Sequence, residues 1–363
     1  MKLLFVEPYF LTAFYFRRQL IKRLAQNNEV FLVIDQDKDH YFSSIEHVHV
    51  LIVRCNLGDR SLISNFRLLR NYKRILKQVN PQVILSFTIK PNLFLPLVKG
   101  KEMRIIANIT GLGRSFQKKG LLNFVVVSLY KKAFSKVDFV FFQNEEIRDV
   151  FAKLRIPVKS SEVIPGSGVD ASYFFYKPII KRPANQRCFL FSARLIPEKG
   201  IDLFLDAARL AKKEFSSANF IVAGKMDSKY STIIEQCVRD GVIEYKGFVS
   251  DMRELYWQSD CVVLPSVYKE GMSNVLLEAL SCGRVIITSK ITSGCKETVL
   301  EGENGFGINP YSVDDLLLAE RKILSMSEEQ LNSMGEKGSS FVKESFNREY
   351  VVDRYLKVIN SNV

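Results

Sequence analysis

Short apolar runs alternate with amphipathic helical patterns along almost the whole chain, and this alternation restricts the fold more than any other feature. The first half contains the runs KLLFVEP, EVFLVID, HVHVLIV, PQVILSFT, RIIANIT and VDFVFFQ. The second half contains CFLFSAR, NFIVAGK, IEYKGFV, CVVLPS, RVIITSK and FGINP. Such runs predict buried strands, and the helical patterns between them predict crossover connections. We therefore expect an α/β protein with parallel sheets.

The chain has 363 residues, which is long for one domain and favours two. The segment VIPGSGVDASYFFYKP at 163–178 is rich in turn residues and reads as a linker between two similar halves. We expect a first Rossmann-like domain at 1–165, a second at 166–346, and a final helix at 347–363 that crosses back to the first. In such folds ligands bind beyond the carboxyl ends of the strands, here in a cleft between the two domains.

Positive charge is concentrated in the first half. Residues 1–165 contain 27 Lys and Arg against 13 Asp and Glu, and residues 54–136 contain 17 basic residues but only Asp59 and Glu102 as acidic ones. This excess predicts an anionic partner, either nucleic acid or an anionic membrane surface. The scattered cysteines are typical of reduced thiols in a cytoplasmic protein. The start, MKLLFVEPYF, reads as a strand, and we expect no signal peptide or transmembrane helix.

The stretch FSARLIPEKGIDLFLDAARL at 191–210 reads as a strand, a turn and a helix. Arg194 and Lys199 flank the turn, which contains Pro197 and Gly200. Two cations next to a helix N-terminus are suited to binding a phosphate group. The alternative is a pair of exposed basic loop residues.

The stretch EGMSNVLLEALSCG at 270–283 reads as a loop, a helix and a C-cap. The backbone amides at the helix start are suited to a diphosphate. Glu278 lies four residues after Asn274 and faces the same side, where its carboxylate can accept hydrogen bonds from a ribose diol. Glu270, in the loop, can reach sugar hydroxyls, so the set predicts a nucleotide-sugar site. The alternative is an acidic surface helix. The backbone amides at the helix start that we expect to bind the diphosphate are those of Gly271, Met272, Ser273 and Asn274.

The acidic triplets at 35–37 and 37–39 are the other candidates for chemistry. Asp35, Asp37 and Asp39 resemble a DxD metal motif, but they lie far in sequence from the phosphate site. No pair of histidines has the spacing of metal ligands to support such a motif. We therefore expect no metal site.

The motifs ARLIPEKG, GFVSDM, EGMSNVLLEALSCG and ENGFGINP resemble those of retaining GT-B glycosyltransferases, the glycogen-synthase-like superfamily that includes glycosyltransferase family 4. EGMSNVLLE matches its E-x7-E motif. The resemblance implies that Arg194 and Lys199 bind the donor diphosphate, that Glu278 binds the ribose, and that Glu270 binds the sugar. It also implies that the loop with Phe248 and Val249 lies beside the base.

The first half resembles a narrower group through FRRQLIKRL, SFTIKPN and NITGLG. These motifs are similar to those of bacterial transferases that extend undecaprenyl-diphosphate-linked glycans. Many relatives carry a histidine where this chain has Thr110, so Thr110, Lys90 or the backbone from Gly111 takes over its contact to the donor sugar. Arg17 and Arg18 are candidates for the acceptor diphosphate. The basic segment 114–138, with its apolar residues, is a candidate for contact with a membrane.

We therefore expect a metal-independent, retaining hexosyltransferase with two parallel-sheet domains, the first binding the acceptor and the second a UDP-sugar. The donated sugar is an N-acetylhexosamine or a hexose, and the acceptor is a polyprenyl-diphosphate-linked saccharide of a surface polysaccharide such as O-antigen or capsule. We expect the enzyme at the cytoplasmic face of the inner membrane, with no cofactor and no nucleic acid partner. The alternatives are a UDP-sugar epimerase and a transferase with a soluble acceptor; no GxGxxG follows the first strand, which disfavours a dehydrogenase.

Overall fold

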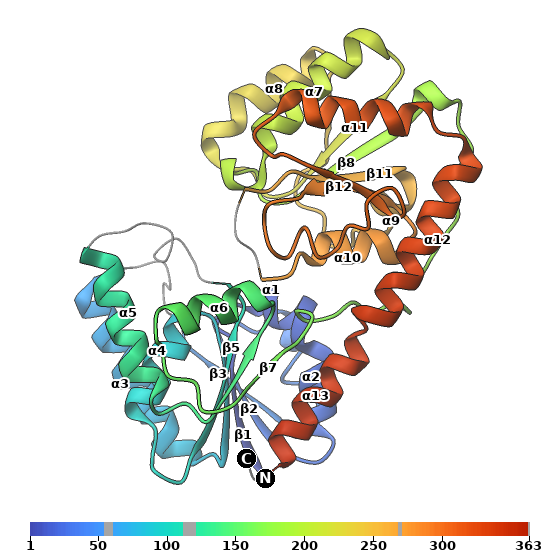
Figure 1. The fold of residues 1–363 in the computed structure, drawn as a ribbon. Coiled ribbons are helices and arrows are strands. Elements are labelled where there is room, and N and C mark those ends of the chain that lie inside the picture. The colour runs from blue at the N-terminus through green and yellow to red at the C-terminus, as the bar shows by residue number, and fades with distance from the viewer. Residues whose placement is uncertain (54–60, 112–120, 268–270, 362–363) are drawn as a thin grey trace. The chain divides into compact units, whose positions relative to one another are not determined.

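The computed structural model describes residues 1–53, 61–111, 121–267 and 271–361, which form two compact units (Figure 1). The N-terminal unit consists of Met1–Ser167 with Glu349–Val363, and the C-terminal unit of Gly168–Arg348. Each unit is built on one parallel β-sheet, as the alternating pattern predicts.

The sheet of the N-terminal unit has the strand order β3-β2-β1-β4-β5-β6-β7, and all of its pairings are parallel. The strand order reverses between β1 and β4, as in a doubly wound sheet. The first six strands coincide with the apolar runs of the first half, and the short β7 lies at the start of the expected linker. The strands are β1 (Lys2–Val6), β2 (Glu29–Ile34), β3 (Val48–Ile52), β4 (Val83–Phe87), β5 (Arg104–Ile109), β6 (Phe139–Phe142) and β7 (Ser161–Val163).

Helices cover both faces of this sheet (Figure 1). On one face Leu3 and Phe5 pack with α2 and α13, and on the other Leu4 and Val6 pack with α3, α4, α5 and α6. Successive residues of β1 therefore face opposite cores, as expected for a strand buried on both sides. The helices are α1 (Phe10–Thr12), α2 (Arg18–Ala25), α3 (Leu62–Val79), α4 (Ile89–Val98), α5 (Leu121–Phe134), α6 (Glu145–Lys153) and α13 (Arg348–Asn360).

The final helix is fixed to the N-terminal unit by polar contacts as well as by its apolar face. The Tyr355 hydroxyl donates to Asn108 Oδ1 at 2.6 Å, and the Arg104 guanidinium donates to carbonyl oxygens near the end of α13, including that of Val358 at 2.6 Å. These hydrogen bonds satisfy carbonyl groups at the helix end that have no partner within the helix.

The segment FRRQLIKRLAQN at 16–27 lies in an irregular helical region that begins before it. After α1 the chain forms a π-helical turn, η1 (Ala13–Arg17), and only then the regular helix α2. Wider turns of this kind are rare, and they frequently occur at functional sites.

The sheet of the C-terminal unit has the strand order β10-β9-β8-β11-β12-β13, again with parallel pairings throughout. Its strands are β8 (Cys188–Ser192), β9 (Asn219–Ala223), β10 (Glu244–Tyr245), β11 (Cys261–Leu264), β12 (Val285–Ser289) and β13 (Gly305–Ile308). Its helices are α7 (Ile201–Glu214), α8 (Ser231–Arg239), α9 (Arg253–Gln258), α10 (Asn274–Ser281), α11 (Val313–Ser325) and α12 (Glu328–Ser345). Helix α7 packs on α11 and α10 packs on α12, around one apolar core.

Candidate active site

The turn between β8 and α7 carries the two cations that the sequence singles out. After β8 the chain passes Arg194, forms a 3-10 turn at Pro197–Lys199 and enters α7 through Gly200. Gly200 has a φ of 78°, and a Cβ atom there would lie 2.2 Å from the carbonyl oxygen of Pro265, so glycine is required. Arg194 is exposed and Lys199 is half-buried. The packing of this turn against the end of β11 fixes where both cations emerge.

Hydrogen bonds join the loop after β11 to this turn. The carbonyl oxygen of Glu198 accepts from the Ser266 hydroxyl and from the Val267 amide, both at 3.0 Å. Strands β8 and β11 are parallel neighbours, so both loops lie at the carboxyl edge of the sheet. Ligands of open α/β sheets bind at this edge.

Helix α10 starts at the same edge. Its N-cap residue, Ser273, makes no side-chain capping hydrogen bond, and Asn274 begins the helix. Gly271, Met272 and Ser273 are buried, and Asn274 is half-buried. The Ser273 amide donates to the carbonyl oxygen of Gly294 at 3.2 Å, so it is occupied. The amides of the first helical turn have no partner within the helix, and the aligned peptide dipoles make this end positive, which stabilises an anion.

A buried tyrosine holds Glu278, one turn further along α10. The Tyr256 hydroxyl donates to Glu278 Oε2 at 2.9 Å. Part of Glu278 reaches the surface, but its carboxyl is surrounded by protein. This burial raises the pKa of Glu278 to about 7, against the opposing effects of the Tyr256 hydrogen bond and the charge of Arg348. Both ionisation states are therefore populated near neutral pH.

The sequence patterns do not single out Tyr256. It precedes Glu278 by 22 residues and lies on α9, where an apolar helical pattern predicts only burial. Its hydrogen bond to Glu278 is a tertiary contact, and neither spacing nor residue type gives a signal for it.

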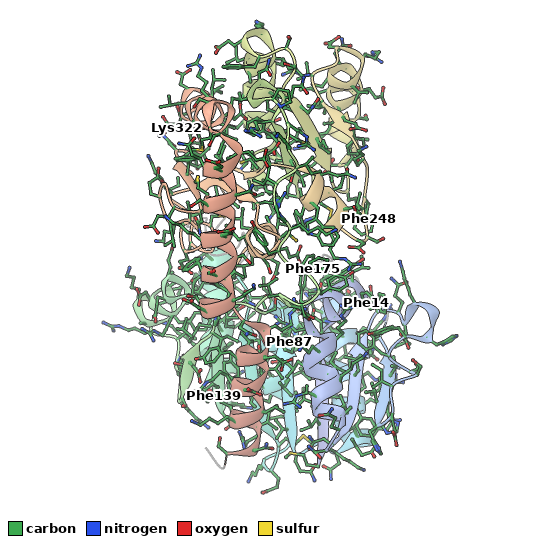
Figure 2. The ribbon with its side chains drawn as sticks, turned by 90° about the vertical axis from the view of Figure 1, so that its right-hand side faces the viewer. Phe14, Phe87, Phe139, Phe175, Phe248 and Lys322 are labelled. Atoms are coloured by element: carbon green, nitrogen blue, oxygen red, sulfur yellow. The ribbon has the colours of Figure 1, made fainter. Side chains whose placement is uncertain are left out.

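Phe248 and Val249 follow β10 at the same edge of the sheet. The preceding residue, Gly247, accepts a hydrogen bond from the Gly224 amide at 2.7 Å, which joins the loops after β9 and β10. Val249 is half-buried, whereas 60% of Phe248 is exposed (Figure 2). An exposed ring at this edge is suited to stacking against a nucleobase.

Apart from Glu270, the remaining predicted site residues belong to the N-terminal unit. Thr110 and Gly111 follow β5, Lys90 lies in the first turn of α4, and Arg18 begins α2; all four are half-buried. Arg17 is only 3% exposed, and its guanidinium lies over an aromatic ring at the end of β4. The roles of these residues stay predictions. Glu270 lies outside the described residues.

The acidic residues near β2 serve the local backbone. Asp35 Oδ1 accepts a hydrogen bond from the Phe10 amide at 2.8 Å. Asp37 accepts from the amides of Phe42 and Ser43 at 3.0 and 2.9 Å, and these bonds, with that of the Ser43 hydroxyl, lower its pKa despite partial burial. Among the residues that the structure describes, no group of His, Cys, Asp and Glu side chains has the arrangement of a metal site.

Two models of known protein families together match most of the chain. Residues 173–341 match the family model of glycosyl transferases group 1, and residues 2–144 match that of glycosyl transferase 4-like proteins.

Individual proteins of this kind match along nearly the whole chain. This chain is 28% identical over 368 aligned positions to the N,N'-diacetylbacillosaminyl-diphospho-undecaprenol alpha-1,3-N-acetylgalactosaminyltransferase of Campylobacter jejuni subsp. jejuni serotype O:2. The alignment covers 95% of this chain and 94% of that protein. Sucrose-phosphate synthase from Thermosynechococcus elongatus superposes with a TM-score of 0.80 at 17% identity, over 99% of this chain and 98% of that one. Anabaena Alr3699/HepE in complex with UDP-glucose gives a TM-score of 0.77 at 16% identity, over 99% of both chains. The chain therefore belongs to the GT-B glycosyltransferases of the family 4 superfamily.

Proposed function

We propose that this chain transfers a sugar, an N-acetylhexosamine or a hexose, from a UDP-sugar to a saccharide linked to polyprenyl diphosphate, during assembly of a bacterial surface glycan. One observation carries the proposal. The turn with Arg194 and Lys199 follows β8, and α10, which carries Glu278 one turn from its start, follows the neighbouring strand β11, so both segments begin at the carboxyl edge of the C-terminal sheet. Cations, helix amides and a carboxylate are the groups that a nucleoside diphosphate needs.

Two of the compared proteins support the choice of substrates. The name of the Campylobacter jejuni relative states a diphospho-undecaprenol acceptor and an N-acetylgalactosaminyl group. The Anabaena structure contains UDP-glucose, which is a donor of the proposed class.

The donor site divides into four parts. Arg194, Lys199 and the first amides of α10 bind the diphosphate, because all three favour negative charge. The carboxylate of Glu278 accepts hydrogen bonds from the two ribose hydroxyls, and Tyr256 holds it in place. The ring of Phe248 lies against the base. Glu270 binds hydroxyls of the transferred sugar.

The same groups promote the reaction. Departure of UDP develops negative charge on the β-phosphate, and fixed cations with a helix N-terminus stabilise that charge without a metal ion. Removal of one such donor typically costs roughly 3 kcal/mol of barrier, so Arg194→Ala lowers kcat by roughly 100-fold or more. The anomeric configuration is retained, with the acceptor attacking from the face that UDP leaves.

The acceptor is reached at a membrane surface. Among the described residues no helix is long and apolar enough to cross a bilayer. Helices α3 and α5 nevertheless both pack on α4 and expose large apolar side chains on one face of the N-terminal unit. Neither helix contains an acidic residue. Apolar side chains ringed by basic ones bind anionic interfaces, here the cytoplasmic face of the inner membrane. The apolar residues are Leu62, Ile63, Phe66, Phe124, Val125 and Leu129; the exposed basic ones are Arg67, Arg70, Lys73, Arg74, Lys77, Lys131, Lys132 and Lys136.

Thermal unfolding in the presence of UDP tests the donor site. A ligand at 100 times its Kd stabilises the folded state by about 2.7 kcal/mol, so UDP raises the Tm of the wild type. Arg194→Ala should respond much less, whereas Lys213→Ala, which removes an exposed cation at the far end of α7, should respond as the wild type does. Equal shifts in all three proteins contradict the diphosphate assignment.

A screen of UDP-sugars for UDP release, with and without a prenyl-diphosphate-linked saccharide, tests the reaction. Release that depends on the lipid-linked saccharide is the expected result. Release that a soluble sugar stimulates equally well contradicts the proposed acceptor.

A further inference from the structure

Glu7, Arg17 and Thr88 lie near the ends of β1 and β4, where the strand order of the N-terminal sheet reverses, and each has at least one buried polar atom. Strand β1 runs into Glu7 and β4 runs into Thr88, and the two strands are parallel neighbours. The chain proceeds from β1 toward β3 on one side and from β4 toward β7 on the other. Arg17 joins them from the π-helical turn. In doubly wound sheets, ligands bind at this reversal point.

Glu7 is fully buried, and neither carboxylate oxygen makes a hydrogen bond of normal geometry to the described residues, although the Tyr9 amide is close enough to favour the carboxylate. Burial raises the pKa of Glu7 to about 7 and outweighs the charge of Arg17 and the Tyr9 amide, which both favour the ionised form. Leaving a buried polar group without a partner is unfavourable and uncommon in native structures. A hydrogen-bond donor from outside the unit would remove that penalty.

Arg17 and Thr88 show the same deficit. Arg17 is 3% exposed, its guanidinium lies 4.7 Å from the centroid of the Phe87 ring, and its Nε has no hydrogen-bond partner within the described part of the chain. The Oγ1 atom of Thr88 is buried and likewise without a partner there. Thr88 also has a φ of 68° and a ψ of 171°, a conformation that residues with a side chain rarely adopt. Backbone strain of this kind clusters at ligand sites.

The chemistry of the three side chains selects an uncharged polyol. A carboxylate accepts from a hydroxyl group, a guanidinium donates to a ring or hydroxyl oxygen, and a threonine hydroxyl does both. A phosphate group would meet the charge of Glu7, and a metal ion would meet the charge of Arg17. Arg17 is therefore suited to a sugar oxygen, whereas the sequence suggests the acceptor diphosphate as its partner.

We propose that Glu7, Arg17 and Thr88 bind the hydroxyl groups of a sugar ring at the carboxyl end of the N-terminal sheet. The inference rests on the proposed function, for which it names the residues of the N-terminal unit that hold a sugar. The ring belongs either to the acceptor saccharide or to the sugar being transferred, since both offer the same hydroxyl chemistry. Because Glu7 is fully covered, the proposal requires that the segment Tyr9–Arg17, which contains the π-helical turn, shifts to let the ring reach the carboxylate.

The variant Glu7→Gln tests the proposal, because it preserves the shape of the side chain and removes its charge. Glu46→Gln is the matched control, since Glu46 lies in the same unit with 88% of its side chain exposed. Thr88→Gly is a second variant that removes a hydroxyl group and relieves the backbone strain. We expect all three proteins to fold and to show the UDP-induced rise in Tm of the wild type.

The decisive readout is sugar transfer to a short-chain prenyl-diphosphate-linked disaccharide, from the UDP-sugar that the wild type turns over. We expect Glu7→Gln and Thr88→Gly to lower kcat/KM for the disaccharide at least tenfold. Hydrolysis of the donor without acceptor distinguishes the two sources. An unchanged hydrolysis rate assigns the ring to the acceptor, and an equal fall assigns it to the donor.

The inference alone would be overturned if Glu7→Gln and Thr88→Gly both fold and their rates of sugar transfer and donor hydrolysis stay within twofold of the wild-type rates. A wild type that releases UDP from no UDP-sugar would contradict the proposed function itself, and the inference would fall with it.

Discussion

Replacing Tyr256 with phenylalanine removes the hydroxyl that donates to Glu278 and leaves the buried ring in place. The lost hydrogen bond joins a neutral donor to a carboxylate at 2.9 Å. A bond of this type contributes about 1.5–3 kcal/mol, and each 1.4 kcal/mol corresponds to a tenfold change in an equilibrium constant. The variant should therefore bind a proton at Glu278 about 10- to 100-fold more tightly than the wild type.

The consequence is a change in how UDP affinity depends on pH. Burial already raises the pKa of Glu278 to about 7, so the wild-type carboxylate becomes the main form as pH rises through neutrality. Only the carboxylate accepts hydrogen bonds from both ribose hydroxyls. UDP affinity should increase from pH 6 to pH 8 in the wild type, and in Tyr256→Phe the same increase should occur at higher pH.

Isothermal titration calorimetry of UDP between pH 6 and pH 9 measures this shift. Tyr230→Phe is the matched control, since Tyr230 is also buried and donates to a carboxylate, Asp202, at 2.8 Å. Comparison with this control also removes the titration of UDP's own phosphate. The reasoning is refuted if Tyr256→Phe and Tyr230→Phe show the same pH profile, or if Tyr256→Phe binds UDP equally weakly at every pH.

Three further predictions concern stability and membrane binding. Glu320 is fully buried without a hydrogen-bond partner among the described residues, and burial raises its pKa to about 8. Ionisation of Glu320 costs the folded state nothing below the unfolded pKa near 4.5, and the cost grows to roughly 4 kcal/mol by pH 8, so the Tm of Glu320→Gln should fall less between pH 5 and pH 8 than that of the wild type; parallel curves would contradict this. Gly200→Ala should lower the Tm and weaken UDP binding, whereas Gly241→Ala, at a similar φ of 68° but in open space, should cause only backbone strain of about 1 kcal/mol; equal effects would exclude the clash as the cause. Phe66→Ser should reduce sedimentation with anionic liposomes at low salt, while Tyr350→Ser, on the opposite face of the N-terminal sheet, should not; equal binding by both would exclude α3 from the membrane contact.

The strands were predictable because their signal is local. Residues buried on both faces of a parallel sheet form continuous apolar runs, and CFLFS and CVVL became β8 and β11. The short strand β10 and the π-helical turn before α2 were not foreseen in those forms. The extent of β10 depends on its pairing within the sheet. The π-helical turn ends at Arg17, which packs over Phe87 from another element, and such a tertiary contact has no local sequence signal.

The candidate site was partly predictable for the same reason. Gly200 indicates a turn, and the residues around Ser273 indicate a helix start, each from a few neighbouring positions. The loops that carry the predicted diphosphate ligands could therefore be located from the sequence. The environment of Glu278 could not be predicted from the sequence, because Tyr256 reaches it from another helix. Glu7 likewise reads as the polar end of a strand, and its burial without a partner emerges only from the folded unit.

A crystal of the full chain soaked with UDP would examine the donor site most directly. We expect electron density for the diphosphate at the first turn of α10, within reach of Arg194 and Lys199, with the ribose hydroxyls on the Glu278 carboxylate. Ordered UDP elsewhere on the protein, with these residues unoccupied, would contradict the assignment.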